Sequence, residues 1–169
     1  MDSEKLKEIL ENHKHWLNED CDGWRDMRAD LSGADLRRAD LSGAKNVPFI
    51  PYACPDTGAF IGFKKAKLYS PDETKAQDVI VELEILADAR RSSATGRKCR
   101  CDKAKVLSVT TLDGVAVKLD AGTVRSSYAT DFVYEVGRII TAPNFCEDRW
   151  EECAPGIHFF INRQEAVEY

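Results

Sequence analysis

The sequence predicts a mainly β protein in three parts: an N-terminal helix, a short solenoid, and a mostly antiparallel β domain with a short C-terminal helix. Three observations predict it. A five-residue repeat runs through residues 29–44, alternating apolar runs recur from Phe60 onward, and Asn162 with Glu165 has the spacing of a helix capping box. We place the boundaries at residues 1–20, 21–48 and 49–169.

The first segment has the spacing of an amphipathic helix, with Asp2 or Ser3 available as N-cap. Its apolar positions are Leu6, Ile9, Leu10, Trp16 and Leu17. A solenoid needs a cap over its apolar end, so we expect the ring of Trp16 or Trp24 to lie over the first leucine layer. The alternative is a helix that packs on the larger domain.

The second segment reads Ala29-Asp30-Leu31-Ser32-Gly33, Ala34-Asp35-Leu36-Arg37-Arg38 and Ala39-Asp40-Leu41-Ser42-Gly43. A period of five fits neither a helix nor a strand, and favours a solenoid with leucine on its axis. The segment resembles the pentapeptide-repeat family. That resemblance implies about one turn of right-handed quadrilateral β-helix, and such a short array needs support from its neighbours.

The third segment reads as short strands joined by turns. Residues 79–85 alternate, with Val79, Val81, Leu83 and Ile85 on one face. Asp113-Gly114 predicts a hairpin between flanking apolar runs. Further strands are expected at residues 60–63, 104–109, 115–119, 132–137 and 156–161.

Composition limits the classes of partner. The net charge of −5 argues against general nucleic-acid binding. No apolar run reaches the roughly 20 residues of a membrane span, and the polar start is unlike a signal peptide. We therefore expect a cytoplasmic protein without a membrane partner, with reduced cysteines and no cofactor.

The basic segment, residues 89–105, holds seven Lys or Arg residues and one Asp. Hydroxyls and guanidinium groups in this order suit an anion or a partner surface. The candidate binding residues are Arg90, Arg91, Ser92, Ser93, Thr95, Arg97, Lys98 and Arg100. The alternative is a solvated hairpin paired with the acids Glu82, Glu84, Glu147, Asp148, Glu151 and Glu152.

Cysteine and histidine offer two weaker patterns. Cys99 and Cys101 could join Cys54, Cys146, Cys153 or His158 around zinc, yet no Cys-x-x-Cys pair is present, and buried packing is the alternative. Cys153 precedes His158 across a Pro-Gly turn, which suits a Cys–His nucleophile. The alternative is a hydrogen-bonded core histidine.

Residues 92–100 and 153–160, supported by 54–62 and 133–137, resemble a domain of unknown function that follows pentapeptide repeats in bacteriophage and bacterial proteins. The resemblance implies phage or prophage genes expressed in the cytoplasm of a bacterial host cell, and it implies no established catalytic residues. We therefore expect a phage-type, non-enzymatic binding protein that inhibits or modulates a host defence or nucleic-acid-handling protein.

Two alternatives to this binding protein stay open: a nucleotide or phosphometabolite-binding domain that uses residues 90–105, and a Cys/His enzyme. An exposed solenoid end is also compatible with a homodimer. If the basic segment binds a partner, Arg97→Ala and Arg100→Ala are expected to weaken binding without lowering thermal stability.

Overall fold

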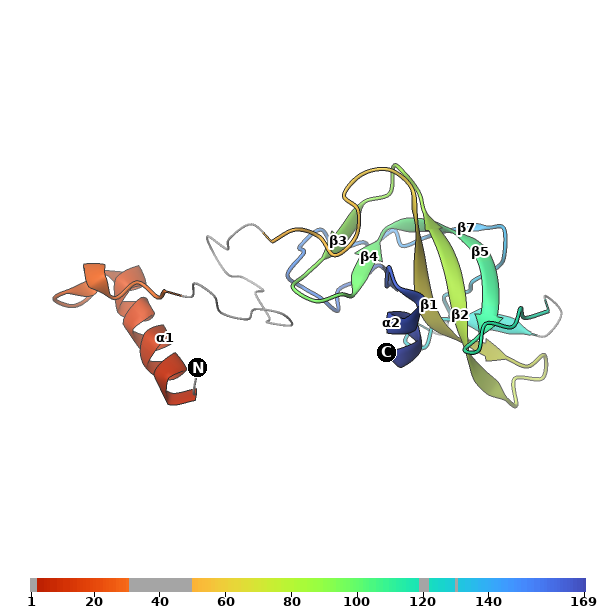
Figure 1. Cartoon of the computed structure of the whole chain (residues 1–169), viewed down its shortest axis with the longest axis horizontal. Coiled ribbons are helices and arrows are strands. Elements are labelled where there is room, and N and C mark those ends of the chain that lie inside the picture. The colour runs from red at the N-terminus through yellow and green to blue at the C-terminus, as the bar shows by residue number, and fades with distance from the viewer. Residues whose placement is uncertain (1–2, 31–49, 119–121, 130) are drawn as a thin grey trace. The chain divides into compact units, whose positions relative to one another are not determined.

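The structure is a computed structural model, and it describes residues 3–30, 50–118, 122–129 and 131–169 (Figure 1). The chain divides into two compact units, residues 1–36 and residues 37–169. The predicted boundary at residue 48 and residues 31–48 of the predicted solenoid, with its leucine layers, lie outside the described residues.

The first unit contains helix α1 (Ser3–Asn18) and a short 3-10 helix, η1 (Trp24–Asp26). The predicted N-terminal helix is confirmed. Trp16 stacks on His13 with ring centroids 5.1 Å apart, and the Arg28 guanidinium lies 5.4 Å from the Trp16 ring centre. No side chain whose burial is described in residues 4–30 is fully buried, and Leu10 and Leu17 are exposed.

The second unit is built around a five-stranded sheet in the order β6-β1-β2-β5-β7, with every described pairing antiparallel. Its long strands are β1 (Phe60–Tyr69), β2 (Ala76–Ile85) and β5 (Lys103–Thr111), which lie side by side in Figure 1. The short edge strands are β6 (Thr123–Arg125) and β7 (Ile139–Thr141). The sequence therefore predicts the antiparallel class correctly.

Strand β2 is the centre of this sheet, and its alternation has the predicted result. Val79, Val81, Leu83 and Ile85 are all fully buried in the core, because a β-strand sends alternate side chains to one face. Ile80 on the other face is buried as well, and helix α2 (Arg163–Glu168) contacts β1 and β2. The alternation of residues 79–85 alone does not predict that the second face of β2 is covered as well.

A three-stranded sheet lies in the same unit, in the order β3-β4-β8. Its strands are β3 (Arg91–Ser93), β4 (Cys99–Cys101) and β8 (Ile157–Phe159). Phe63 of β1 and Phe160 exchange backbone hydrogen bonds at 2.7 and 2.8 Å, which ties the two sheets together. A Cβ on Gly62 would lie 2.6 Å from the Phe159 ring, so glycine is needed where these sheets approach.

Local signals at the turns and caps are confirmed in part. The Asn162 side chain accepts a hydrogen bond from the Gln164 amide at 2.8 Å and caps α2, whereas Glu165 turns to Arg97 at 2.8 Å. Gly114 forms the predicted turn, and Thr111 N–H donates to Val115 O.

The strands predicted after that turn are shorter than expected. The segments at residues 115–118 and 132–137 form only isolated bridges, at Thr110–Ala116 and Arg125–Val133. No helix in the described residues is long and apolar enough to cross a membrane.

Candidate anion-binding pocket

The basic segment predicted as a binding loop is largely built into the three-stranded sheet. Arg91, Ser92 and Ser93 form β3, and Arg100 is the central residue of β4. All four are buried, and Arg100 is only 2% exposed. These four side chains are therefore inside the domain and do not form an exposed anion cradle.

Arg91 is held by backbone oxygens. Its guanidinium donates to five carbonyls, at distances between 2.8 and 3.4 Å: Ala89, Pro55, Gly58, Leu86 and Ala87. An arginine side chain carries five N–H donors, so this arrangement uses its full donor capacity. Arg91 joins the irregular segment before β1 to the end of β2.

Arg100 and Arg149 also donate hydrogen bonds to backbone carbonyls of other segments. Arg100 donates to the carbonyl oxygens of Cys146, Asp148 and Glu151. Arg149 donates to those of Ile50, Ser93 and Ala94 at 2.6–3.2 Å. The Arg100→Ala expectation is therefore corrected: we expect removal of this buried side chain to leave three carbonyls without their donor and to lower stability.

The exposed arginines of the segment are paired with acids. Arg90 forms ion pairs with Asp102 at 2.9 Å and Glu147 at 2.8 Å, and Arg97 pairs with Glu165 at 2.8 Å. Thr95 lies half-buried in the connection between β3 and β4. Of the predicted binding residues, Lys98 alone lines the pocket described next.

This pocket has a volume of about 170 Å³ and lies beside β1, β8 and α2. Its lining is rich in lysines and aromatic rings: Lys64, Lys65, Asp78, Lys98, Ser127, Tyr128, His158, Phe160 and Tyr169. Asp78, the acid in this lining, is paired with Lys67 at 2.8 Å. The pocket therefore carries an excess of positive charge within an acidic protein.

Lys64 is the central feature of the pocket. It lies opposite Val81 on the core face of β1, and no hydrogen bond or ion pair of its ammonium group occurs within the described residues. Burial, and then the positive charge of Lys98, lower its pKa to about 8. The site is short of a negative charge.

Lys98 approaches the pocket from the connection that enters β4. Its Nζ lies 3.4 Å from the Tyr169 hydroxyl and 3.5 Å from Cys153 Sγ. Burial disfavours its charge, but Tyr169, Cys153 and Glu152 outweigh that cost and raise its pKa. Tyr169 also packs on Phe160, with ring centroids 5.2 Å apart, so the aromatic wall holds the ammonium group in place.

His158 contributes a neutral ring. Its Nε2 donates to the Ala154 carbonyl at 2.9 Å, which leaves Nδ1 as an acceptor. Burial, together with Lys64, Lys98 and Arg100, lowers its pKa to about 4 against the opposing effect of that hydrogen bond. Among the described contacts, Cys153 pairs with Lys98, and it has no hydrogen bond with His158.

Cys99 and Cys101, the weak metal candidates, are in the core. The neighbouring Cys54 thiol and burial raise the pKa of Cys99, and burial raises that of Cys101. Metal binding needs thiolates, which this setting disfavours. Within the described residues, neither cysteine belongs to a group of three or more metal donors.

The sequence contains a signal for Lys64 in the alternation of β1. Gly62, Ala66 and Leu68 are buried on one face of β1, and Lys64 falls on the same face by its spacing of two. A lysine at a strand position whose neighbours on the same face are apolar indicates a charged side chain on the core face. The strand predicted at residues 60–63 ends before Lys64, so that prediction does not include this lysine.

Comparison with protein families identifies the family of the domain that contains this pocket. Residues 50–166 match the model described as a family of unknown function (DUF5758). The chain belongs to this family. The DUF5758 match covers both sheets and most of α2, and residues 27–45 match pentapeptide repeats. No curated protein and no solved structure matches the chain.

Proposed function

We propose that the DUF5758 domain binds a small anion, with one phosphate or carboxylate group, in the pocket beside β1, β8 and α2. The observation that carries this proposal is Lys64, a half-buried lysine on the core face of β1 whose ammonium group has no acidic partner within the described residues. A buried charge without a counter-charge is costly, and an anionic ligand would compensate it.

The size and chemistry of the pocket support a single small group. Its 170 Å³ lies below the roughly 300–1,000 Å³ typical of sites for larger organic ligands. Lys64 and Lys98 offer charged donors, and the unprotonated Nδ1 of His158 accepts from a hydroxyl or a protonated phosphate. We favour a phosphate-sized ligand over the whole nucleotide expected from the sequence.

Titration calorimetry of the full chain with inorganic phosphate, pyrophosphate and acetate at pH 7 tests the proposal. We expect saturable binding of at least one of them, weakened about ten- to hundredfold by Lys98→Met, since a charged hydrogen bond contributes about 1.5–3 kcal/mol. Lys103→Met is the matched control, because Lys103 pairs with Asp88 and does not line the pocket.

Either of two results would reject anion binding at this pocket. One is the absence of binding by all three probes. The other is equal weakening by the Lys98 and Lys103 variants, which would indicate a general charge effect.

The setting of the protein is also proposed here. The pentapeptide-repeat match supports one turn of right-handed β-helix ahead of the domain. Action in a bacterial cytoplasm, on a host protein and as a phage-type inhibitor, remains our proposal from the sequence. It would be tested by affinity capture from a bacterial lysate with the wild-type chain and with the Lys98 variant.

A further inference from the structure

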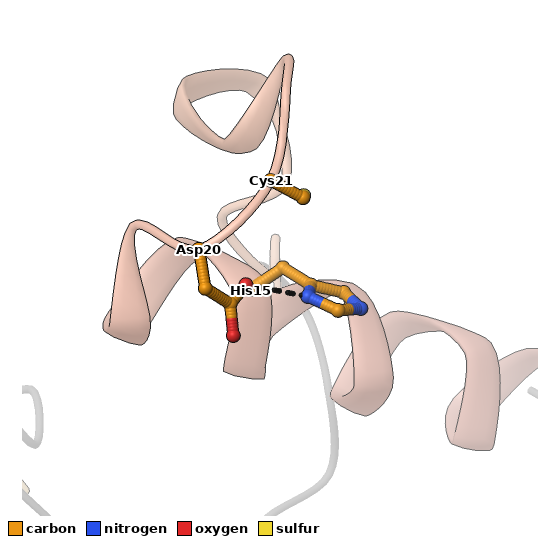
Figure 2. Close-up of side chains that lie close together, drawn as sticks. All are labelled: His15, Asp20 and Cys21. Carbon is orange, nitrogen blue, oxygen red and sulfur yellow. Dashed lines mark hydrogen bonds and ion pairs between the residues drawn. The ribbon is translucent and has the colours of Figure 1, made fainter.

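Three potential metal ligands lie together in the first unit, far along the chain from the anion pocket. They are His15 in the last turn of α1, and Asp20 and Cys21 just beyond it. One ligand atom from each lies within 4.8 Å of the others. Figure 2 shows the carboxylate of Asp20 turned toward the imidazole of His15, with Cys21 beside them.

The end of α1 brings these residues together. Glu19 adopts a left-handed backbone conformation, φ 55°, and its N–H donates to His15 O at 2.9 Å. The chain therefore turns back, so that Asp20 Oδ1 lies 2.7 Å from His15 Nδ1. Asn18 Nδ2 donates to the second Asp20 oxygen at 3.4 Å and helps to orient the carboxylate.

Cys21, the residue after Asp20, completes the group. Its side chain is half-buried, and its Sγ lies 3.7 Å from Met27 Sδ, at the end of η1. The three candidate ligands are thus contributed by the end of α1 and by the turn that leads to η1. A bound ion would fasten the end of α1 to the turn that leads to η1.

Exposure is high in the described part of the unit that carries the group. No side chain of described burial in residues 4–30 is fully buried, and the apolar residues Leu10 and Leu17 are 47% and 58% exposed. Segments this small are usually stabilised by a metal, a disulfide or a partner surface. A metal at the end of α1 would supply part of that stability.

We propose that His15, Asp20 and Cys21 bind a zinc-class divalent ion. Imidazole nitrogen, thiolate sulfur and carboxylate oxygen together are a zinc donor set, whereas calcium and magnesium prefer oxygen alone. Small side-chain rotations bring the three atoms to tetrahedral spacing, and water takes the fourth position. Cys21 loses its thiol proton to the buffer as its sulfur bonds the ion, and the proton that His15 Nδ1 donates to Asp20 moves to Nε2 or to the buffer so that Nδ1 can bind.

The test uses the full chain, stripped with a chelator and titrated with Zn²⁺ and then with Co²⁺ as a spectroscopic probe. We expect one ion per chain, a gain in helical circular dichroism, and a thiolate-to-cobalt charge-transfer band. Cys21→Ser should abolish the band, and His15→Gln should weaken Zn²⁺ binding at least tenfold. The matched control is Cys153→Ser, because Cys153 is an exposed cysteine of the other unit.

Retained α-helical circular dichroism in the metal-free variants shows that the substitutions act on binding and not on folding. Asp20→Asn provides a second variant, which keeps the shape of the side chain and removes its charge. Absence of Zn²⁺ uptake by the wild-type chain, or a cobalt band that survives Cys21→Ser, would overturn the site. Neither result bears on anion binding by the DUF5758 domain.

Discussion

Lys64 and Lys65 are adjacent in β1, yet their ammonium groups have opposite surroundings. Lys65 Nζ donates to the Val167 carbonyl at 2.9 Å and ties β1 to α2. Lys64 lies on the core face beside Val81, and within the described residues its ammonium has no such acceptor. One lysine therefore stabilises the fold, while the other is held at a cost that a bound anion would offset.

The Lys64→Met variant is expected to be more stable than the wild type. A shift in pKa from 10.5 to about 8 corresponds to about 3 kcal/mol of unfolding free energy at pH 7, at 1.36 kcal/mol per pKa unit. Lys65→Met, the matched control, should lose about 1 kcal/mol with its hydrogen bond. Urea denaturation of both variants measures the two effects, and a destabilised Lys64→Met would contradict the assignment.

Lys64 also predicts a pH dependence at high pH. Between pH 8 and 10.5 the unfolded chain binds more protons than the folded protein at this residue, so stability rises with pH in this window. The affinity for phosphate should fall over the same range as Lys64 loses its charge. Denaturation and calorimetry at a series of pH values test both, and Lys64→Met should remove both slopes.

His158 predicts the dependence at low pH. Its pKa is about 4 in the folded protein and 6.5 ordinarily, so its contribution is complete above pH 6.5 and is lost as pH falls toward 4. The loss amounts to as much as about 3 kcal/mol. His158→Gln keeps a donor for Ala154 O and does not titrate, so its stability should fall less between pH 6.5 and 4. Identical slopes would show that His158 is not the group responsible.

Buried and exposed arginines of the basic segment should behave differently. Arg91→Met leaves five carbonyls without their donor and should lower the unfolding free energy by about 3 kcal/mol or more. Arg97→Ala removes an ion pair with a 59% exposed side chain and should change it by less than about 1 kcal/mol. Thermal melting compares them, and similar losses would contradict this division.

Thiol alkylation separates the cysteines by access. Cys153 is exposed and should react first with iodoacetamide at neutral pH, followed by the half-buried Cys21 and Cys146. Cys54, Cys99 and Cys101 are buried and should react only when the protein unfolds. Mass spectrometry of digests gives the order, and early labelling of Cys99 would mean that the three-stranded sheet opens readily.

Much of the DUF5758 domain could be predicted from local pattern. Alternation placed Val79, Val81, Leu83 and Ile85 on a buried face, because strand geometry converts a period of two into a face. Asn162 identified its helix start because N-capping acts over three residues. The irregular segment at residues 132–137 was harder, since its few bridges depend on β6 and not on its own composition.

The residues of the candidate site could be predicted less well from local sequence pattern. Composition showed that residues 89–105 are basic, but not that Arg91 and Arg100 turn inward to carbonyls contributed by distant segments. Lys98 was predicted as a binding residue only as one member of a larger set, and it is the member of that set in the lining of the pocket. Lys64 and Tyr169 join it through the packing of β1 and α2, 105 positions apart in the chain.

The sequence by itself determined the repeats, the antiparallel class of the domain, its central strand and its helix cap, because each follows from neighbours a few residues apart. Only the tertiary structure decided which charged side chains donate to backbone carbonyls in the interior, and which have no partner within the described residues. That choice depends on backbone carbonyls and burial supplied by residues far away in the chain. The lysine pocket is therefore a property of the fold, whereas the His15, Asp20 and Cys21 group depends on the local turn that ends α1.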